Sequence, residues 1–167
     1  MKNHDVILKK LSYEKYYQLR NYRFSSDSLE YDDPDRLLPS EEEEKNWWNE
    51  DVITNNHVIL AIENNGVICG VVNAFSFDRI NNSCEIGIEI YPKNNFSKGL
   101  GKISFGLFIE YLKEKEKIRI VKAETNIRNN AMIKILEYFH FKKTMRHVEN
   151  EITWQCFEKN LELMPRI

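Results

Sequence analysis

The hydrophobic pattern is most regular along residues 83–91, where three isoleucines alternate with polar or small residues. A period of two predicts a β-strand with one buried face, and here that face carries Ile86, Ile88 and Ile90. Pro92 and two asparagines follow at once, and these residue types favour turns. We therefore expect the strand to end near Tyr91.

A helical pattern follows Gly101, with apolar residues every three or four positions. The recurring row is Ile103, Leu107 and Tyr111, and beside it lie Phe105, Phe108 and Leu112. A stripe of this width is typical of a helix packed against a core. The charged run over residues 113–117 predicts the end of the helix.

The loop between this strand and this helix contains Gly99 and Gly101, flanked by Lys98 and Lys102. Glycines let the backbone approach a ligand closely, and the first N–H groups of a helix have no partner within it. Because the helix dipole also favours negative charge at this end, the order strand, glycine loop, helix predicts an anion site. The two lysines add positive charge.

The remaining pattern predicts strands over residues 6–11, 57–63, 67–77, 118–124 and 151–157, with another beginning at 140. Helices are expected over residues 12–22, 40–51 and 130–139, and residues 25–39 read as a loop. The Asn-Asn-Gly sequence at 64–66 predicts a hairpin. The strand at 118–124 follows a helical crossover, so we expect it to run parallel to residues 83–91. This order predicts one α/β domain over residues 1–167, with a mixed sheet.

Composition narrows the function classes. The chain is 42% hydrophobic and 30% charged, and its net charge of −2 argues against nucleic acid as a main partner. No run approaches the roughly 18 apolar residues of a membrane span, so we expect no membrane partner and a cytoplasmic protein. Cys69, Cys84 and Cys156 are scattered, and we expect buried, reduced thiols. The four histidines show no ligand spacing, so no metal is predicted.

Two motifs resemble a known family. Phe96-Ser97-Lys98-Gly99-Leu100-Gly101 is similar to the pattern Gln/Arg-x-x-Gly-x-Gly/Ala, with Phe96 at the first position. Residues 129–141 are similar to Asn-x-x-Ser/Ala-Ile-x-x-Leu/Tyr-Glu-Lys-x-Gly-Phe, with His140 at the glycine. Residues 58–143 thus resemble the GNAT superfamily of acyl-CoA-dependent N-acyltransferases, in the branch of ribosomal-protein N-terminal and spermidine acetyltransferases.

The resemblance implies a mostly antiparallel sheet in which the parallel strands at 83–91 and 118–124 splay apart. Acetyl-CoA, as co-substrate, would place its pantetheine arm in this wedge and its pyrophosphate on the glycine loop. The cofactor residues implied are Ile90, Tyr91, Phe96, Ser97, Lys98, Gly99, Leu100, Gly101, Lys102, Asn126 and Asn129. For Phe96, covering the cofactor and simple packing are equal alternatives.

Acetyl transfer to an amine needs a group that takes up a proton. Glu85 aligns with a general-base glutamate found in some members of the family, and Glu89 lies on the same strand face as an alternative base or substrate anchor. The competing interpretation is that both glutamates face solvent or pair with Lys122. The usual acid of the family is a tyrosine, and its position is Leu136 here, so the proton donor is unassigned.

In the family, the region between the first two helices forms a wall of the acceptor site, and the acidic segment from residue 27 to 51 lies in that region. We take Tyr31, Asp32 and Asp33 as candidate substrate residues, and we favour a solvated, capped helix face for Glu41, Glu42, Glu43 and Glu44. The acceptor stays open among polyamine, amino sugar, aminoglycoside and protein N-terminus. The last strand is also compatible with a homodimer. A non-catalytic acyl-CoA-binding sensor or regulatory protein is the alternative function.

Overall fold

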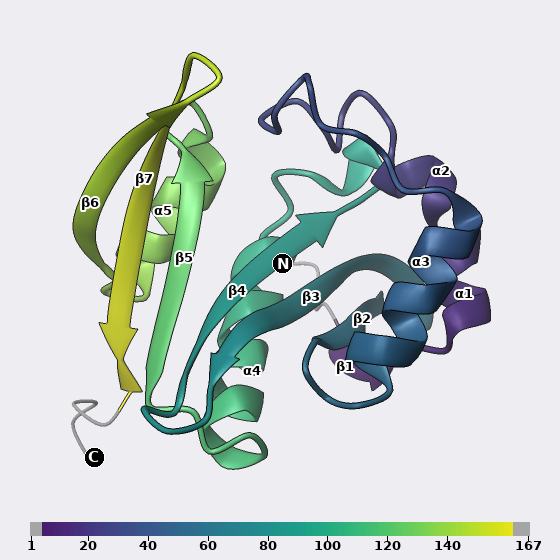
Figure 1. The fold of residues 1–167 in the computed structure, drawn as a ribbon, viewed down its shortest axis with the longest axis horizontal. Coiled ribbons are helices and arrows are strands. Elements are labelled where there is room, and N and C mark those ends of the chain that lie inside the picture. The colour runs from purple at the N-terminus through teal and green to yellow at the C-terminus, as the bar shows by residue number, and fades with distance from the viewer. Residues whose placement is uncertain (1–4, 162–167) are drawn as a thin grey trace.

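The computed structural model describes residues 5–161 and contains one seven-stranded sheet (Figure 1). The strand order is β1-β2-β3-β4-β5-β7-β6. The strands are β1 (Val6–Lys10), β2 (Val58–Asn64), β3 (Val67–Asp78), β4 (Ser83–Ile90), β5 (Ile120–Asn126), β6 (Lys142–Glu149) and β7 (Ile152–Asn160). The mixed α/β class is confirmed, and the order of strands and helices is as predicted except that residues 12–22, expected as one helix, form two short helices.

The middle of the sheet contains the predicted parallel pair. β4 and β5 are paired over Ser83–Ile120, Cys84–Val121 and Glu85–Lys122, and the other strand pairs of the sheet are antiparallel. Beyond this short pairing the two strands diverge, which opens a wedge between them (Figure 1). The splayed arrangement expected from the resemblance is therefore present.

Two apolar clusters lie on opposite faces of the sheet. The larger joins β2, β3, β4, β5 and β7 to α4 (Leu100–Glu114) and α5 (Asn130–Tyr138). The smaller packs α1 (Tyr13–Gln18), the end of α3 (Glu41–Trp47) and the π-helical turn η1 (Trp48–Val52) onto the other face of β2 and β3. A short helix α2 (Arg20–Arg23) follows α1, and a 3₁₀ turn η2 (Lys93–Asn95) follows β4.

Local sequence signals explain where several elements begin. The Ser12 side chain accepts a hydrogen bond from the Lys15 N–H at 3.2 Å and starts α1. Ser40 and Glu43 form the predicted capping box of α3, in which each side chain satisfies a backbone N–H of the other residue. The Asn-Asn-Gly turn joins β2 and β3 as expected, with Asn65 and Gly66 at positive φ.

The buried face of α4 differs from the predicted stripe. Ile103 and Leu107 are each 40% exposed, whereas Phe105, Phe108 and Leu112 are fully buried. The helix turns its 105, 108 and 112 row towards the sheet, because these positions are three and four residues apart and share one side. The row that contains Ile103 lies at the flank. Within residues 5–161, no helix combines the length and the hydropathy needed to cross a bilayer.

Candidate functional site

The glycine loop at the start of α4 has the geometry of an anion cradle. Gly99 is the N-cap residue, and its φ of +80° lies in the left-handed region that favours glycine. A Cβ built on Gly99 meets nothing within 4 Å, so the backbone is open to a ligand. Since the first intrahelical bond runs from Ile103 N to Gly99 O, the N–H groups of Leu100 to Lys102 have no helical acceptor. The fit to a pyrophosphate is good.

Close packing fixes this loop beside the wedge. A Cβ on Gly101 would lie 3.2 Å from Cδ1 of Ile135 and 3.8 Å from a side-chain carbon of Ile90. Glycine at this position thus lets α4 approach both α5 and the end of β4. Lys102 lies over the Tyr138 ring, with Nζ 3.8 Å from the ring centroid, and both side chains are exposed. The cationic group is therefore held at the outer side of the loop.

At the edge of β4 that faces the wedge, the available backbone N–H and C=O groups belong to Ile90 rather than to Tyr91. The Tyr91 N–H donates to the carbonyl of Cys69 on β3 at 2.9 Å, and the Tyr91 carbonyl accepts from Asn95 Nδ2 at 3.2 Å. Because backbone groups alternate in direction along a strand, the polar groups of Ile90 point towards the β5 side. Strand pairing with β5 has ended before this point.

The two asparagines predicted to contact the cofactor already have hydrogen-bond partners within the protein. Asn126 donates from Nδ2 to the Tyr31 carbonyl at 3.3 Å and accepts from the Arg128 N–H at 2.9 Å. Asn129 is the N-cap of α5 and accepts from the Met132 N–H at 3.1 Å. Both side chains therefore shape the turn after β5, at the edge of the wedge.

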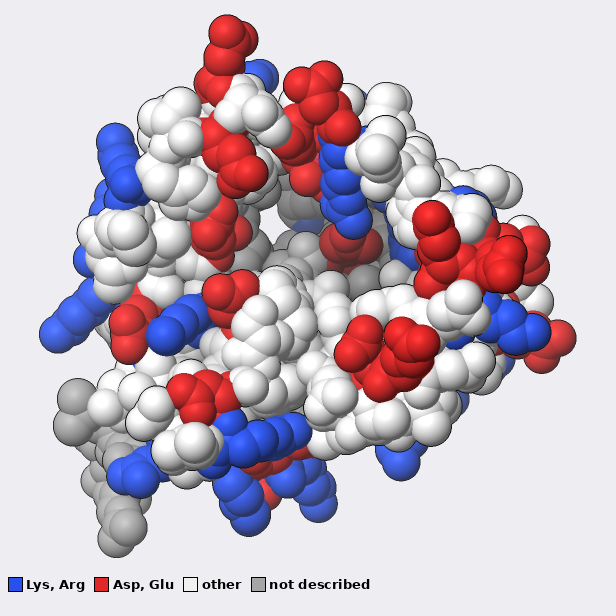
Figure 2. Space-filling model, in the orientation of Figure 1, with Lys and Arg blue, Asp and Glu red and all other residues white. Residues whose placement is uncertain are grey.

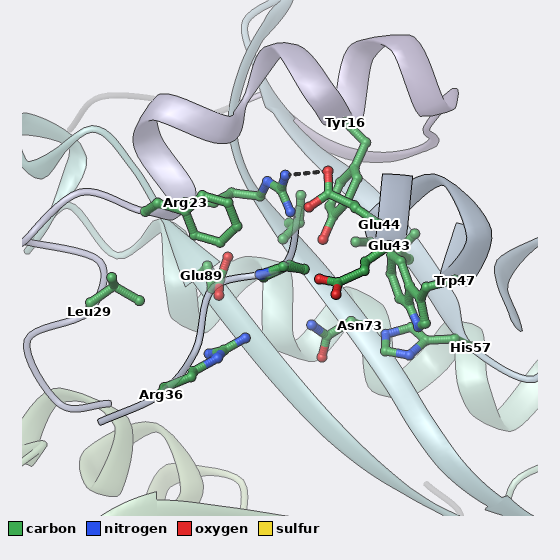
Figure 3. Close-up of a pocket in the computed structure, with 14 residues that line it drawn as sticks. Tyr16, Arg23, Leu29, Arg36, Glu43, Glu44, Trp47, His57, Asn73 and Glu89 are labelled. Atoms are coloured by element: carbon green, nitrogen blue, oxygen red, sulfur yellow. Dashed lines mark hydrogen bonds and ion pairs between the residues drawn. The ribbon is translucent and has the colours of Figure 1, made fainter. Parts of the chain in front are cut away.

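A cavity of about 310 Å³ lies on the face of the sheet that carries the smaller cluster, between the N-terminal helices and the strands (Figure 3). Figure 2 shows carboxylates on both sides of a hollow in this view of the surface. The lining combines aromatic, basic and acidic side chains. They are Tyr16, Arg23, Phe24, Leu29, Arg36, Pro39, Glu43, Glu44, Trp47, His57, Ile59, Val71, Asn73 and Glu89.

Glu89 is the carboxylate at the floor of this cavity. It lies on β4, directly before Ile90, and Figure 3 shows its carboxyl group between Arg23 and Arg36. Burial raises the pKa of Glu89, while the positive charges of Arg23 and Arg36 act in the opposite direction. No protein hydrogen bond to its carboxylate is found among the described residues. The group is thus a carboxylate with an elevated proton affinity, next to the wedge.

The wall of the cavity is built on a buried ion pair. Arg23 Nη2 lies 2.8 Å from Glu44 Oε1, and Arg20 Nη1 lies 3.5 Å from Glu44 Oε2. The Arg23 guanidinium carbon also lies 3.7 Å from the centroid of the Tyr16 ring. Glu44 is 3% exposed, so the expectation of a solvated face is wrong for this residue. The reason is that α3 turns this side towards α2, where two arginines meet it.

Three polar atoms around the cavity are buried without a hydrogen-bond partner in the described part of the chain: Arg23 Nε, His57 Nε2 and Asn73 Oδ1. Burial lowers the pKa of His57, which favours the neutral imidazole. The His57 ring stands edge-on to Trp47, with centroids 4.9 Å apart. Buried donors and acceptors without a protein partner are typical of a ligand site.

The other predicted site residues lie around the cavity or away from it. Glu85 is opposite Lys122 in the strand register, partly exposed, and not part of the cavity lining. Asp32 pairs with Arg36, which does line it. Asp33 accepts from Asn150 Nδ2 at 2.6 Å, so the 25–39 loop reaches across to the β6–β7 turn. Phe96 and Ser97 are half-buried, and Lys98 is exposed.

The position of the usual acid is apolar and closed. Leu136 has no exposed surface and belongs to the larger core cluster, whereas Tyr138, two residues later, is 56% exposed. Sequence reasoning missed Arg23, His57 and Asn73, which line the cavity. None of the three belongs to a recognisable sequence motif, and only the packing of α2, β2 and β3 brings them together.

The thiols differ in burial. Cys69 and Cys84 are buried, as expected, but Cys156 is only partly buried. The prediction is wrong for Cys156 because its β7 position alternates with the buried Gln155 and Phe157 and so faces the uncovered side of the sheet.

Solved structures share this fold. A spermidine N-acetyltransferase from Vibrio cholerae, in complex with CoA and spermine, superposes with a TM-score of 0.83 at 16% identity, covering 94% of this chain and 96% of that chain. A domain from Methanocaldococcus jannaschii gives 0.78 at 25% identity, covering 95% and 100%. RimL, a ribosomal L7/L12 alpha-N-protein acetyltransferase in complex with CoA, gives 0.78 at 14% identity, covering 94% of each chain.

A search of curated protein sequences gave no significant match. The sequence model of the acetyltransferase (GNAT) domain, by contrast, matches residues 6–142, which is most of the chain. The match covers β4, the glycine loop, α4, β5 and α5, the elements that form the wedge and the cradle. By fold and by sequence, this chain belongs to the GNAT acetyltransferase family.

Proposed function

We propose that this protein is an N-acetyltransferase that transfers the acetyl group of acetyl-CoA to a primary amine of a small molecule or to a protein N-terminus. One observation carries the proposal. Glu89, a carboxylate whose pKa burial raises, lies between an acceptor-sized cavity and the open edge of β4. A proton acceptor, an amine site and a cofactor site thus meet at one strand end.

The cofactor side of the proposal rests on two backbone features. The cradle from Ser97 to Lys102 would hold the pyrophosphate through N–H groups at the start of α4, where the dipole is favourable. The polar groups of Ile90 would hydrogen-bond the amide-bearing arm as a further strand would. CoA complexes of the V. cholerae enzyme and of RimL, which share the fold, support this assignment.

The acid–base chemistry is assigned to Glu89. Acetyl transfer forms a C–N bond and breaks the thioester C–S bond, and the attacking nitrogen must lose a proton. A primary amine is mostly protonated at neutral pH, so a nearby base is needed, directly or through water. Glu89 is better placed than Glu85, because only Glu89 lines the cavity. With Leu136 buried, the departing thiolate takes its proton from solvent; a thiol is a fair leaving group.

The charge and size of the cavity favour an acceptor whose reacting end is small and positively charged. Glu43 and Glu89 supply negative charge, while Tyr16 and Trp47 supply aromatic surface. A volume of about 310 Å³ suits a polyamine arm or an amino-terminal residue better than a whole aminoglycoside. The names of the relatives, spermidine N-acetyltransferase and alpha-N-protein acetyltransferase, cover the same two classes.

The decisive test is release of free thiol from acetyl-CoA with a panel of spermidine, spermine, amino sugars, aminoglycosides and short peptides. Thermal stability with and without acetyl-CoA is recorded on the same sample. We expect stabilisation by acetyl-CoA and thiol release with one acceptor class. Stabilisation without release from any acceptor would favour the non-catalytic acyl-CoA-binding alternative. The absence of both stabilisation and thiol release would refute the cofactor cradle itself.

A further proposal concerns assembly. The expectation that the last strand pairs with a second copy is wrong, because β7 is already paired with β5 on one side and with β6 on the other. The V. cholerae spermidine N-acetyltransferase forms a dodecamer, and in this chain the exposed strand β6 forms one edge of the sheet. We propose self-association of this chain at least to a dimer. Sedimentation that shows only monomer at all concentrations would refute it.

A further inference from the structure

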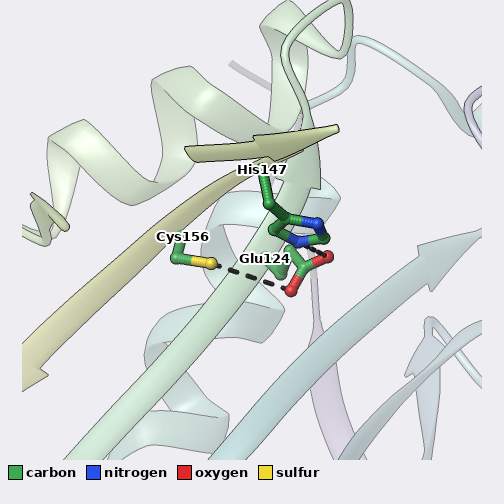
Figure 4. Close-up of side chains that lie close together, drawn as sticks. All are labelled: Glu124, His147 and Cys156. Atoms are coloured by element: carbon green, nitrogen blue, oxygen red, sulfur yellow. Dashed lines mark hydrogen bonds and ion pairs between the residues drawn. The ribbon is translucent and has the colours of Figure 1, made fainter. Parts of the chain in front are cut away.

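Three chemically different side chains meet on the open face of the C-terminal half of the sheet. Glu124 comes from β5, His147 from β6 and Cys156 from β7 (Figure 4). His147 Nε2 lies 2.9 Å from Glu124 Oε1, and Cys156 Sγ lies 3.7 Å from Glu124 Oε2. All three donor atoms lie within 4.8 Å of one another.

Strand register produces this cluster, which is why spacing along the chain did not reveal it. Glu124 is directly opposite Cys156 in the β5–β7 pairing, and His147 is opposite Trp154 in the β6–β7 pairing. Residues two apart on a strand share a face, so Cys156 and Trp154 both point to the uncovered side. Three backbone strands therefore hold the donors in place, which is a more rigid support than a loop provides.

The donor set suits a particular class of ion. Imidazole nitrogen, thiolate sulfur and carboxylate oxygen are the protein ligands of zinc, at about 2.0–2.3 Å from the ion. Donors arranged tetrahedrally at that range are about 3.3–3.8 Å apart, and the three donor atoms here lie within 4.8 Å of one another. Calcium and magnesium prefer oxygen donors throughout, so a thiol and an imidazole argue against them.

We propose that Glu124, His147 and Cys156 form a three-ligand site for Zn²⁺, with the fourth position open to water or to a ligand. On binding, the Cys156 thiol releases its proton to solvent, and neutral His147 binds through Nε2, which ends its present contact with Glu124. The site lies outside the acceptor cavity, and none of its three residues has a role in the proposed acetyl transfer.

The first experiment uses Co²⁺ as a spectroscopic probe on the tag-free, full-length protein, in reducing and metal-free buffer. A thiolate ligand gives a charge-transfer band in the near ultraviolet, and tetrahedral Co²⁺ gives strong visible bands. We expect both bands to saturate at one Co²⁺ per chain and to disappear when Zn²⁺ is added. Absence of the charge-transfer band in the wild-type protein would overturn the proposal.

Variants assign the ligands. Cys156→Ser should abolish the charge-transfer band, and His147→Gln and Glu124→Gln should each weaken Co²⁺ binding by about tenfold or more. Val148→Gln is the matched control on the same strand, because Val148 is next to His147 and 70% exposed. Cys69→Ala controls for loss of a thiol elsewhere. A band retained in Cys156→Ser, or lost equally in the controls, would mean that these three residues form only an ion pair with a thiol contact.

This readout is independent of acetyl transfer. Failure of Co²⁺ binding leaves the cofactor cradle untouched, and an inactive enzyme that still shows the Co²⁺ spectrum leaves the metal site intact. Zn²⁺ should also raise the melting temperature of the wild-type protein and of Val148→Gln, but not that of Cys156→Ser. Equal stabilisation of all three proteins would refute the assignment.

Discussion

The guanidinium of Arg23 lies 2.8 Å from the carboxylate of Glu44, and these side chains are only 6% and 3% exposed. The pair joins α2 to α3 across the wall of the acceptor cavity. Arg23 also stacks on Tyr16, and its positive charge acts on Glu89 below. One buried cation thus fixes two helices and sets part of the electrostatic environment of the proposed base.

Breaking this pair on one side should be costly. We expect Glu44→Gln to lower the free energy of unfolding by about 3–5 kcal/mol, because Arg23 is left as a buried charge without its carboxylate. Urea unfolding followed by tryptophan fluorescence measures the change. Glu137→Gln is the control, since Glu137 pairs with Lys143 at an exposed site and at 3.9 Å. Equal effects of the two substitutions would show that the buried pair has no special role.

The proposed base predicts a clear difference between two glutamates on one strand face. Glu89→Gln should lower kcat by about 10²–10⁴-fold while acetyl-CoA affinity stays near wild type. Glu85→Gln should leave kcat within a few-fold of the wild type, because Glu85 lies outside the cavity lining. Steady-state rates with the accepted amine decide between them. A large loss only in Glu85→Gln would return the base to that residue.

The raised pKa of Glu89 also predicts a pH dependence of stability. Its folded-state pKa lies above the ordinary carboxyl value of 4.5, so the folded protein holds this proton more tightly than the unfolded chain. The stability from this group is present below the ordinary value and is lost as the pH rises through the folded pKa. Glu89→Gln should therefore melt higher than wild type at about pH 7.5 and equally at about pH 4. The opposite ordering would show a lowered pKa.

Two glycines with the same backbone conformation allow a matched test of the cradle. Gly99 has φ +80° and Gly66 has φ +82°, and a Cβ on either residue meets nothing within 4 Å. Gly99→Glu should abolish CoA binding measured by calorimetry, because it puts bulk and negative charge where the phosphates would bind. Gly66→Glu carries the same backbone strain in the β2–β3 turn and should bind CoA normally.

The 25–39 loop offers a test at the far side of the wedge. Asn150 Nδ2 donates to Asp33 Oδ2, so Asn150→Asp would replace an attraction by a repulsion without changing size. We expect faster amide hydrogen exchange within residues 25–39 and a higher KM for the amine, while CoA affinity changes little. Unchanged exchange would mean that this contact does not hold the loop.

Most of the fold could be predicted from the sequence because its signals are local. Alternation gave β4, the Asn-Asn-Gly turn gave the hairpin, and Ser40 with Glu43 gave the start of α3. The orientation of α4 could not be read in this way. Apolar residues occupy more than one side of that helix, and only packing against the sheet decides which row is buried.

The candidate site also has one part that could be predicted from the sequence and one part that could not. The glycine cradle is one continuous segment, so its motif is visible in the sequence. The cavity is assembled from Arg23, His57, Asn73 and Glu89, which come from a short helix and three different strands or their ends. Spacing along the chain carries no information about such contacts. The same holds for His147 and Cys156, which meet only through the register of two hairpin strands.

The short pairing of β4 with β5 has a mechanical consequence. Because only three residue pairs join the two halves of the sheet, backbone hydrogen bonds do not set the angle between them beyond Glu85. Other connections remain: the apolar cluster that includes Phe105, Leu136, Phe141 and Phe157, and the hydrogen bonds from Asn126 and Asn150 to the 25–39 loop. The volume of these core side chains therefore contributes to how far the strands diverge, and changes in volume far from any reacting atom would alter cofactor affinity.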